Sequence, residues 1–213
     1  MPSQSDETFE KNVFINCPFD DAYHSILRPI LFTIIYLGFN PRIASERSDS
    51  GEPRISKICD LINKSKFSIH DLSRLKSKEK NEFYRLNMPF ELGIEYGCRH
   101  FASDHLSGKK CLILEKEEHD FKKALSDLSG VDIKSHSNDP PKAVIAVRNW
   151  FVDTVGLIRV DSPTVIWYKF TDFADDFYTR RKDEGFTDED LNMMPVTEYI
   201  DFIKEWIRIN VGR

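Results

Sequence analysis

Glu91 is the side chain best placed for chemistry, within the sequence NMPFELGIEYG at residues 87–97. Asn87 can cap a helix and Pro89 suits a first helical turn, so a helix is predicted to begin here. Positive partial charge at a helix N-terminus favours an ionised carboxylate. An ionised Glu91 suits a nucleophile or a stabiliser of a cation better than a proton donor. The alternative is that Glu91 only complements the helix dipole.

Two further carboxyl groups bear on this hypothesis. Glu95 follows Glu91 by four residues and shares its predicted helix face, so it is the alternative catalytic carboxylate. Asp71 follows a predicted strand in the sequence SIHDLSR and is the nearby carboxyl that could supply a proton. Glu91 and Asp71 are therefore the predicted catalytic residues.

Eight residues near these acids could bind a substrate. Polar side chains after the first predicted strand could bind ribose hydroxyls, aromatic rings could stack on a base, and arginines could meet phosphate. The structural alternatives are a helix cap for Asp20, a core position for Phe90 and plain solvation for the arginines. The predicted binding residues are Asn16, Phe19, Asp20, Arg42, Ser68, Arg74, Asn87 and Phe90.

Metal and redox chemistry are not expected. His24 and His70 are the only histidines that the sequence places near the site, and neither has a second ligand at helical spacing. The four cysteines lack C-x-x-C spacing, and a Cys17 nucleophile has no assured histidine partner. The turn after the first predicted strand carries neither G-x-G-x-x-G nor a P-loop, and the chain has no G-x-S-x-G elbow. We therefore expect no cofactor.

Composition restricts the partners. The chain has 213 residues, 40% of them hydrophobic, enough for one substantial core and a small appendage. Its net charge of −5 argues against direct nucleic-acid binding. The longest apolar run, residues 29–39, is too short to span a bilayer, and the polar, acidic N-terminus does not resemble a signal or transit peptide. We expect a cytoplasmic protein with no membrane partner.

Strand and helix patterns alternate along most of the chain. Buried strands alternating with amphipathic helices predict an α/β fold with a doubly wound, flavodoxin-like parallel sheet of about five strands. Such sheets place their sites at the carboxyl ends of the strands, which gathers residues 16–20, residues 68–74 and the start of the Glu91 helix. Strands are predicted at residues 12–17, 39–45, 67–69, 110–115 and 131–134, and helices at 19–38, 52–64, from 87, near 120–128 and at 140–155.

Three regions are predicted: a disordered N-terminus at residues 1–10, the α/β domain at 11–158 and a C-terminal helical extension at 159–213. The extension should contain helices at 165–178 and 196–209. Its aromatic stripe is more typical of a packed core than of a ligand site. We expect the extension to pack on the α/β domain or to serve self-assembly. The stripe consists of Trp167, Phe170, Phe173 and Phe177.

Three blocks carry a family resemblance over residues 11–155. FELGIEYG at 90–97 resembles the block with the catalytic glutamate of nucleoside 2-deoxyribosyltransferases, and SIHDLSR at 68–74 resembles their V-x-D-L-S block. The opening VFINCPFDDAYHSILRPILFTIIYLGF is similar to the first strand, turn and helix of bacterial TIR-like proteins, many of them linked to defence. The approach YRLNMP differs from the Gly-rich approach of the deoxyribosyltransferases, which argues against nucleobase exchange. The resemblance implies cleavage or recognition of a nucleotide such as NAD.

The chemistry of N-glycosidic cleavage agrees with this resemblance. An ionised Glu91 could stabilise or capture the oxocarbenium-like sugar. Nicotinamide leaves a pyridinium without a general acid, so an ionised Asp71 would favour NAD over a purine nucleoside. We expect a nucleotide N-glycosidase that forms homo-oligomers and is activated by self-assembly or a partner protein. The alternative is a non-catalytic module that senses a nucleotide or docks another chain.

Overall fold

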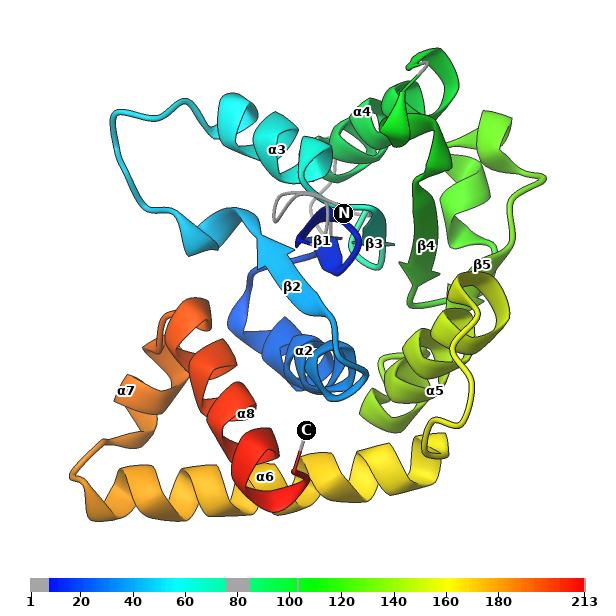
Figure 1. Ribbon diagram of the computed structural model, residues 1–213. Coiled ribbons are helices and arrows are strands. Elements are labelled where there is room, and N and C mark those ends of the chain that lie inside the picture. Colours follow the sequence, from blue (N-terminus) through cyan, green and yellow to red (C-terminus); the bar gives the residue numbers. More distant parts are fainter. Residues whose placement is uncertain (1–7, 76–84, 103, 213) are drawn as a thin grey trace.

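A parallel sheet forms the centre of the molecule in the computed structural model, which describes residues 8–75, 85–102 and 104–212. The described residues form five strands in the order β2-β1-β3-β4-β5, and every neighbouring pair is parallel (Figure 1). This is the flavodoxin-like doubly wound order, so the predicted fold class is confirmed. The strands are β1 (Asn12–Asn16), β2 (Asn40–Ile43), β3 (Phe67–Asp71), β4 (Lys110–Glu115) and β5 (Ile133–Ser135).

Helices cover both faces of the sheet. Helices α2 (His24–Tyr36) and α5 (Pro140–Trp150) lie on one face, and α3 (Arg54–Asn63) and α4 (Asn87–Phe101) lie on the other (Figure 1). Alternate side chains of β1 serve the two layers: Val13 and Ile15 pack in the core on the α2 side, and Phe14 packs in the core on the α3 side. Burial on both faces explains why this strand reads as a continuous apolar run.

Some predicted helices take other forms. The segment predicted to start a helix at residue 19 begins with a 3₁₀ turn, η1 (Asp21–Tyr23), before α2. The predicted helix near 120–128 is wrong: two 3₁₀ turns, η4 (Asp120–Lys123) and η5 (Ser126–Leu128), stand there. The carboxylate of Glu115 accepts hydrogen bonds from the backbone of His119 (2.6 Å) and Phe121 (3.1 Å), which folds this segment into a compact loop.

Helix α5 continues as a π-helical turn, η6 (Phe151–Val155). Two more 3₁₀ turns are η2 (Ala44–Glu46) and η3 (His105–Gly108).

The C-terminal helices form a third layer outside α2 and α5 (Figure 1). They are α6 (Pro163–Asp183), α7 (Asp188–Met193) and α8 (Val196–Asn210). Phe32 of α2 stacks on Phe173 of α6 at 5.6 Å between ring centroids and contacts Trp206 of α8 at 6.0 Å. Phe173 and Phe177 are buried, so the aromatic stripe of α6 is part of the core, as predicted. The extension shares one hydrophobic core with the sheet.

Of the N-terminal segment predicted to be disordered, residues 1–7 lie outside the described part of the chain. Phe9 packs edge-on against His105, with 4.8 Å between ring centroids. No helix within the described ranges is both long enough and apolar enough to cross a membrane.

Candidate functional site

Asn16 joins the end of β1 to the start of α4. It is 2% exposed, and its amide nitrogen donates to the carbonyl of Met88 at 2.9 Å. The same nitrogen lies 3.1 Å from Nδ1 of His70. An amide NH₂ only donates, so His70 accepts at Nδ1 and carries its proton on Nε2. Burial lowers the pKa of His70 to about 3, so its ring is neutral. These contacts hold the first turn of α4 against the carboxyl edge of the sheet.

Glu91 is buried in the second turn of α4, with 3% of its surface exposed. Asn87, four residues earlier, hydrogen-bonds to its side chain. Burial raises the pKa of Glu91, although Arg54 and Asn87 act in the opposite direction. The sequence analysis expected the helix dipole to favour the ionised form, whereas the net shift of the pKa is in the opposite direction. Glu91 lies beyond the first turn, where the dipole effect fades, and loss of solvent outweighs it.

Arg54 is the cation that faces Glu91. Its Nη2 lies 3.8 Å from Oε1 of Glu91, at the long end of the ion-pair range. The Arg54 side chain is 55% exposed, whereas that of Glu91 is 4% exposed. A long ion pair whose cation is half exposed contributes little energy. The carboxylate is thus buried, but its partner can move into solvent.

Asp71 is the last residue of β3 and is 1% exposed. It accepts hydrogen bonds from the Tyr23 hydroxyl, from Nε2 of His136 (3.0 Å), and from the backbone nitrogen (2.8 Å) and hydroxyl of Ser73. Burial opposes the ionised form, yet the bonds from His136, Ser73 and Tyr23 lower the pKa of Asp71 below its ordinary value. Asp71 is therefore a carboxylate held by donors and has no proton to give.

His136 corrects the sequence prediction, which placed only His24 and His70 near the site. It is fully buried after β5, and its Nε2 lies 2.8 Å from the Ser73 hydroxyl as well as close to Asp71. Its Nδ1 accepts the backbone N–H of Asn138 at 3.0 Å. Asp71 and Ser73 thus meet the same ring nitrogen, which is not the arrangement of a Ser-His-Asp triad. The only sequence signal for His136 is its position directly after an edge strand.

Asp20 ties the turn after β1 to the segment that follows β3 and to the residues just before α4. Its carboxylate forms ion pairs with Arg74 and with Nη2 of Arg85 (2.5 Å). Asp20, which was predicted to bind ribose hydroxyls, thus holds two guanidinium groups in place. Burial and the carboxylates of Asp71 and Glu91 raise the pKa of the Cys17 thiol well above its usual range. Cys17 is therefore no thiolate nucleophile, and its thiol lies within electrostatic reach of both predicted catalytic acids.

The remaining predicted residues divide between the site and other regions. Phe19 and Phe90 are 41% and 61% exposed, so neither is a core residue. Arg42 lies on β2 and forms a bidentate ion pair with Glu46. Ser68 lies in the interior of β3, beside Glu95. The structure thus brings Asn16, Asp20, Asp71, Arg74, Asn87 and Glu91 to the carboxyl edge, and it leaves Arg42 and Ser68 away from it.

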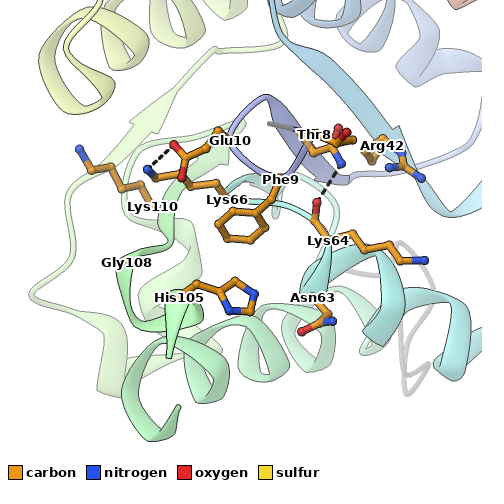
Figure 2. Close-up of a pocket in the computed structure, with 11 residues that line it drawn as sticks. Thr8, Phe9, Glu10, Arg42, Asn63, Lys64, Lys66, His105, Gly108 and Lys110 are labelled. Atoms are coloured by element: carbon orange, nitrogen blue, oxygen red, sulfur yellow. Dashed lines mark hydrogen bonds and ion pairs between the residues drawn. The ribbon is translucent and has the colours of Figure 1, made fainter. Parts of the chain in front are cut away.

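A cavity of about 830 Å³ lies at the opposite, amino-terminal edge of the sheet. Figure 2 shows Phe9 beside His105 in it, with Lys66 turned toward Glu10, 2.6 Å away. Neither predicted catalytic acid lines it. The carboxyl edge, where both predicted catalytic acids lie, therefore remains the candidate site. Within the described ranges, no cluster of three or more His, Cys, Asp or Glu side chains could hold a metal ion.

Searches of protein-family models, of curated proteins and of solved structures found no match to this chain.

Proposed function

We propose that this protein is a nucleotide N-glycosidase that cleaves NAD or a related nucleotide, with Glu91 as the residue that faces the anomeric carbon. The observation that carries the proposal is the burial of this carboxylate at the carboxyl edge, opposite a cation that is itself exposed. In the reaction, the bond from the anomeric carbon to nicotinamide breaks and water adds to that carbon. The products are ADP-ribose, nicotinamide and one proton.

Burial gives Glu91 a selective effect on the transition state. A carboxylate with little solvent around it attracts a nearby positive charge more strongly than an exposed carboxylate does. The sugar becomes cationic as the bond breaks, so the attraction is stronger in the transition state than in bound substrate. Only such differential binding accelerates the chemical step.

Asp71 favours a leaving group that needs no proton. It is ionised and engaged by Tyr23, Ser73 and His136. A purine leaves its sugar more readily when an acid protonates it, whereas nicotinamide leaves a pyridinium as a neutral base. The state of Asp71 therefore supports NAD over a purine nucleoside.

Asn16 supplies a candidate contact to the sugar. Its Oδ1 is buried and accepts no hydrogen bond from any residue in the described part of the chain. A buried acceptor without a partner is costly unless water or a ligand satisfies it. A ribose hydroxyl is a donor of the right kind, and His70 holds the Asn16 amide in the orientation that leaves Oδ1 free.

The test is product formation with matched variants. Purified protein, at low and high concentration to include activation by self-association, is incubated with NAD and with nucleosides, and the products are separated by chromatography. Glu91→Gln should lower the rate at least about a hundredfold, the usual effect of removing a charged group that stabilises a transition state. Glu95→Gln is the control on the same helix and should retain cleavage.

Equal rates for wild type and folded Glu91→Gln would refute the role of Glu91. A nucleotide that raises the unfolding temperature but is recovered intact would support the non-catalytic alternative, a nucleotide-sensing module.

A further inference from the structure

A second cavity lies beside the candidate site, between the carboxyl edge and the C-terminal helices. Its volume is about 420 Å³, within the range of small-molecule sites. Three separate parts of the chain line it: the turn after β1 with α2, the segment from the end of β2 to α3, and the start of α8. We call it the helix groove and define it by Phe19, Arg28, Ser45, Arg54, Met194 and Tyr199.

Arg54 connects the helix groove to Glu91. It is a lining residue of the groove, and its Nη2 lies 3.8 Å from Oε1 of Glu91. The Arg54 side chain is therefore next to both the groove and the buried carboxylate. A ligand that occupies both places must pass Arg54, and a guanidinium binds phosphate oxygens in a bidentate manner.

The lining of the groove suits a flat, anionic group. Phe19 is 41% exposed there, and Tyr199 stands against Arg28, whose guanidinium carbon is 4.9 Å from the ring centroid. Nη2 of Arg28 donates to the carbonyl of Leu191 at 2.8 Å, which fixes it beside the C-terminal helices. No carboxylate is among the described lining residues, so Arg28 gives the groove a positive charge, and Arg54 adds a second when it turns away from Glu91. Aromatic and guanidinium groups together are the usual partners of a base and its phosphate.

We propose that the helix groove binds the second nucleotide of a dinucleotide whose first sugar lies at Glu91, and that Arg54 leaves Glu91 to meet the phosphates joining the two halves. This inference rests on the proposed function and narrows its substrate class to dinucleotides with a diphosphate linkage. It also gives the C-terminal extension a role, because Met194 and Tyr199 form one wall of the site.

The test fills the groove without touching Glu91. Ser45 is an exposed lining residue, so Ser45→Trp should block the groove while the core stays intact. Ser48→Trp, three residues later and outside the groove, is the matched control. NAD is compared with nicotinamide mononucleotide, which has the same scissile bond but lacks the second nucleotide. Ser45→Trp should lower kcat/KM for NAD by about tenfold or more, the equivalent of about 1.4 kcal/mol, and change that for the mononucleotide by less than about twofold.

Equal losses for the two substrates, or no loss for NAD, would overturn the inference while Glu91-dependent cleavage could still stand. If wild type cleaves neither substrate, the proposed function fails and ADP-ribose becomes the probe. A rise in unfolding temperature with ADP-ribose in wild type and Ser48→Trp, but not in Ser45→Trp, would then retain the groove assignment. No rise in wild type would refute it.

Discussion

Glu91 and Glu95 lie about one turn apart on the same helix, yet their surroundings at the two ends of the sheet differ. Both are buried, and burial raises the pKa of each. Glu95 faces Lys109, whose side chain is 0% exposed, at 3.4 Å. Nζ of Lys109 also donates to the carbonyls of Ile62 (2.7 Å) and Ser65. Glu91 faces the half-exposed Arg54 at 3.8 Å.

The difference separates a structural ion pair from an available carboxylate. Lys109 is fully buried and donates hydrogen bonds to two backbone carbonyls. Glu95 therefore cannot exchange this partner for solvent or for a ligand. Arg54 can turn outward and find water, so Glu91 can exchange its partner for a ligand. Burial alone does not identify a catalytic group, and the exposure of its partner is the more informative feature.

The largest expected effect is the loss of Lys109. Lys109→Met leaves Glu95 buried without a counter-charge, and we expect the free energy of unfolding to fall by about 3–5 kcal/mol. Arg54→Met, the corresponding change at the other end, should cost less than about 1 kcal/mol, because Arg54 is half exposed and lies 3.8 Å from Glu91. Urea unfolding of the two variants measures both values. Similar losses in the two variants would show that the two ion pairs are equivalent, and would contradict the distinction between a structural ion pair and an available carboxylate.

Neutralising the acids should give effects of opposite sign on stability. The folded pKa of Glu91 is raised, so the stability it contributes is present below its unfolded pKa of about 4.3 and is lost as the pH rises through the folded value. Glu91→Gln should thus be more stable than wild type at pH 7, by roughly 0.5–2 kcal/mol, with the gain vanishing below about pH 4. Burial also raises the pKa of Glu95, which by itself would give the same gain. Glu95→Gln, however, leaves the fully buried Lys109 without its counter-charge, and because this loss should be the larger effect, we expect the variant to be less stable at pH 7.

Unfolding of the two glutamine variants and wild type across this pH range is the measurement. A stability gain in Glu95→Gln, or a loss in Glu91→Gln, would reverse the roles assigned to the two acids.

The smallest effect concerns the pH dependence of activity. Arg54 lowers the pKa of Glu91 against the influence of burial, so Arg54→Gln should raise this pKa further. In the proposed reaction Glu91 acts in its ionised form, so the acid limb of kcat/KM against pH should move to higher pH in the variant. Arg47→Gln, which removes a guanidinium paired with Asp60 and Glu52, should leave the limb in place. An unchanged limb in Arg54→Gln would indicate that the two side chains do not interact in solution.

Some elements of the fold could be predicted from the local sequence pattern, and others could not. The apolar runs of β1 and β4 and the amphipathic pattern of α8 identify their elements, because burial on two faces or on one stripe leaves a clear period in sequence. The loop after β4 was predicted as a helix, and its apolar residues do have a helical spacing. Its conformation depends on the carboxylate of Glu115, whose bonds to His119 and Phe121 have no periodic signature.

The sequence by itself determined that Asn16, Asp71 and Glu91 would lie at the same edge of the sheet, because parallel strands end at one edge and the helix that follows starts there. Only the tertiary structure decided that His136 holds Asp71, that Arg54 faces Glu91, and that Glu95 faces Lys109. These partners come from elements far apart in the chain. Four residues along α4 advance the backbone by about 6 Å, enough to put two acids of the same helix face in different surroundings.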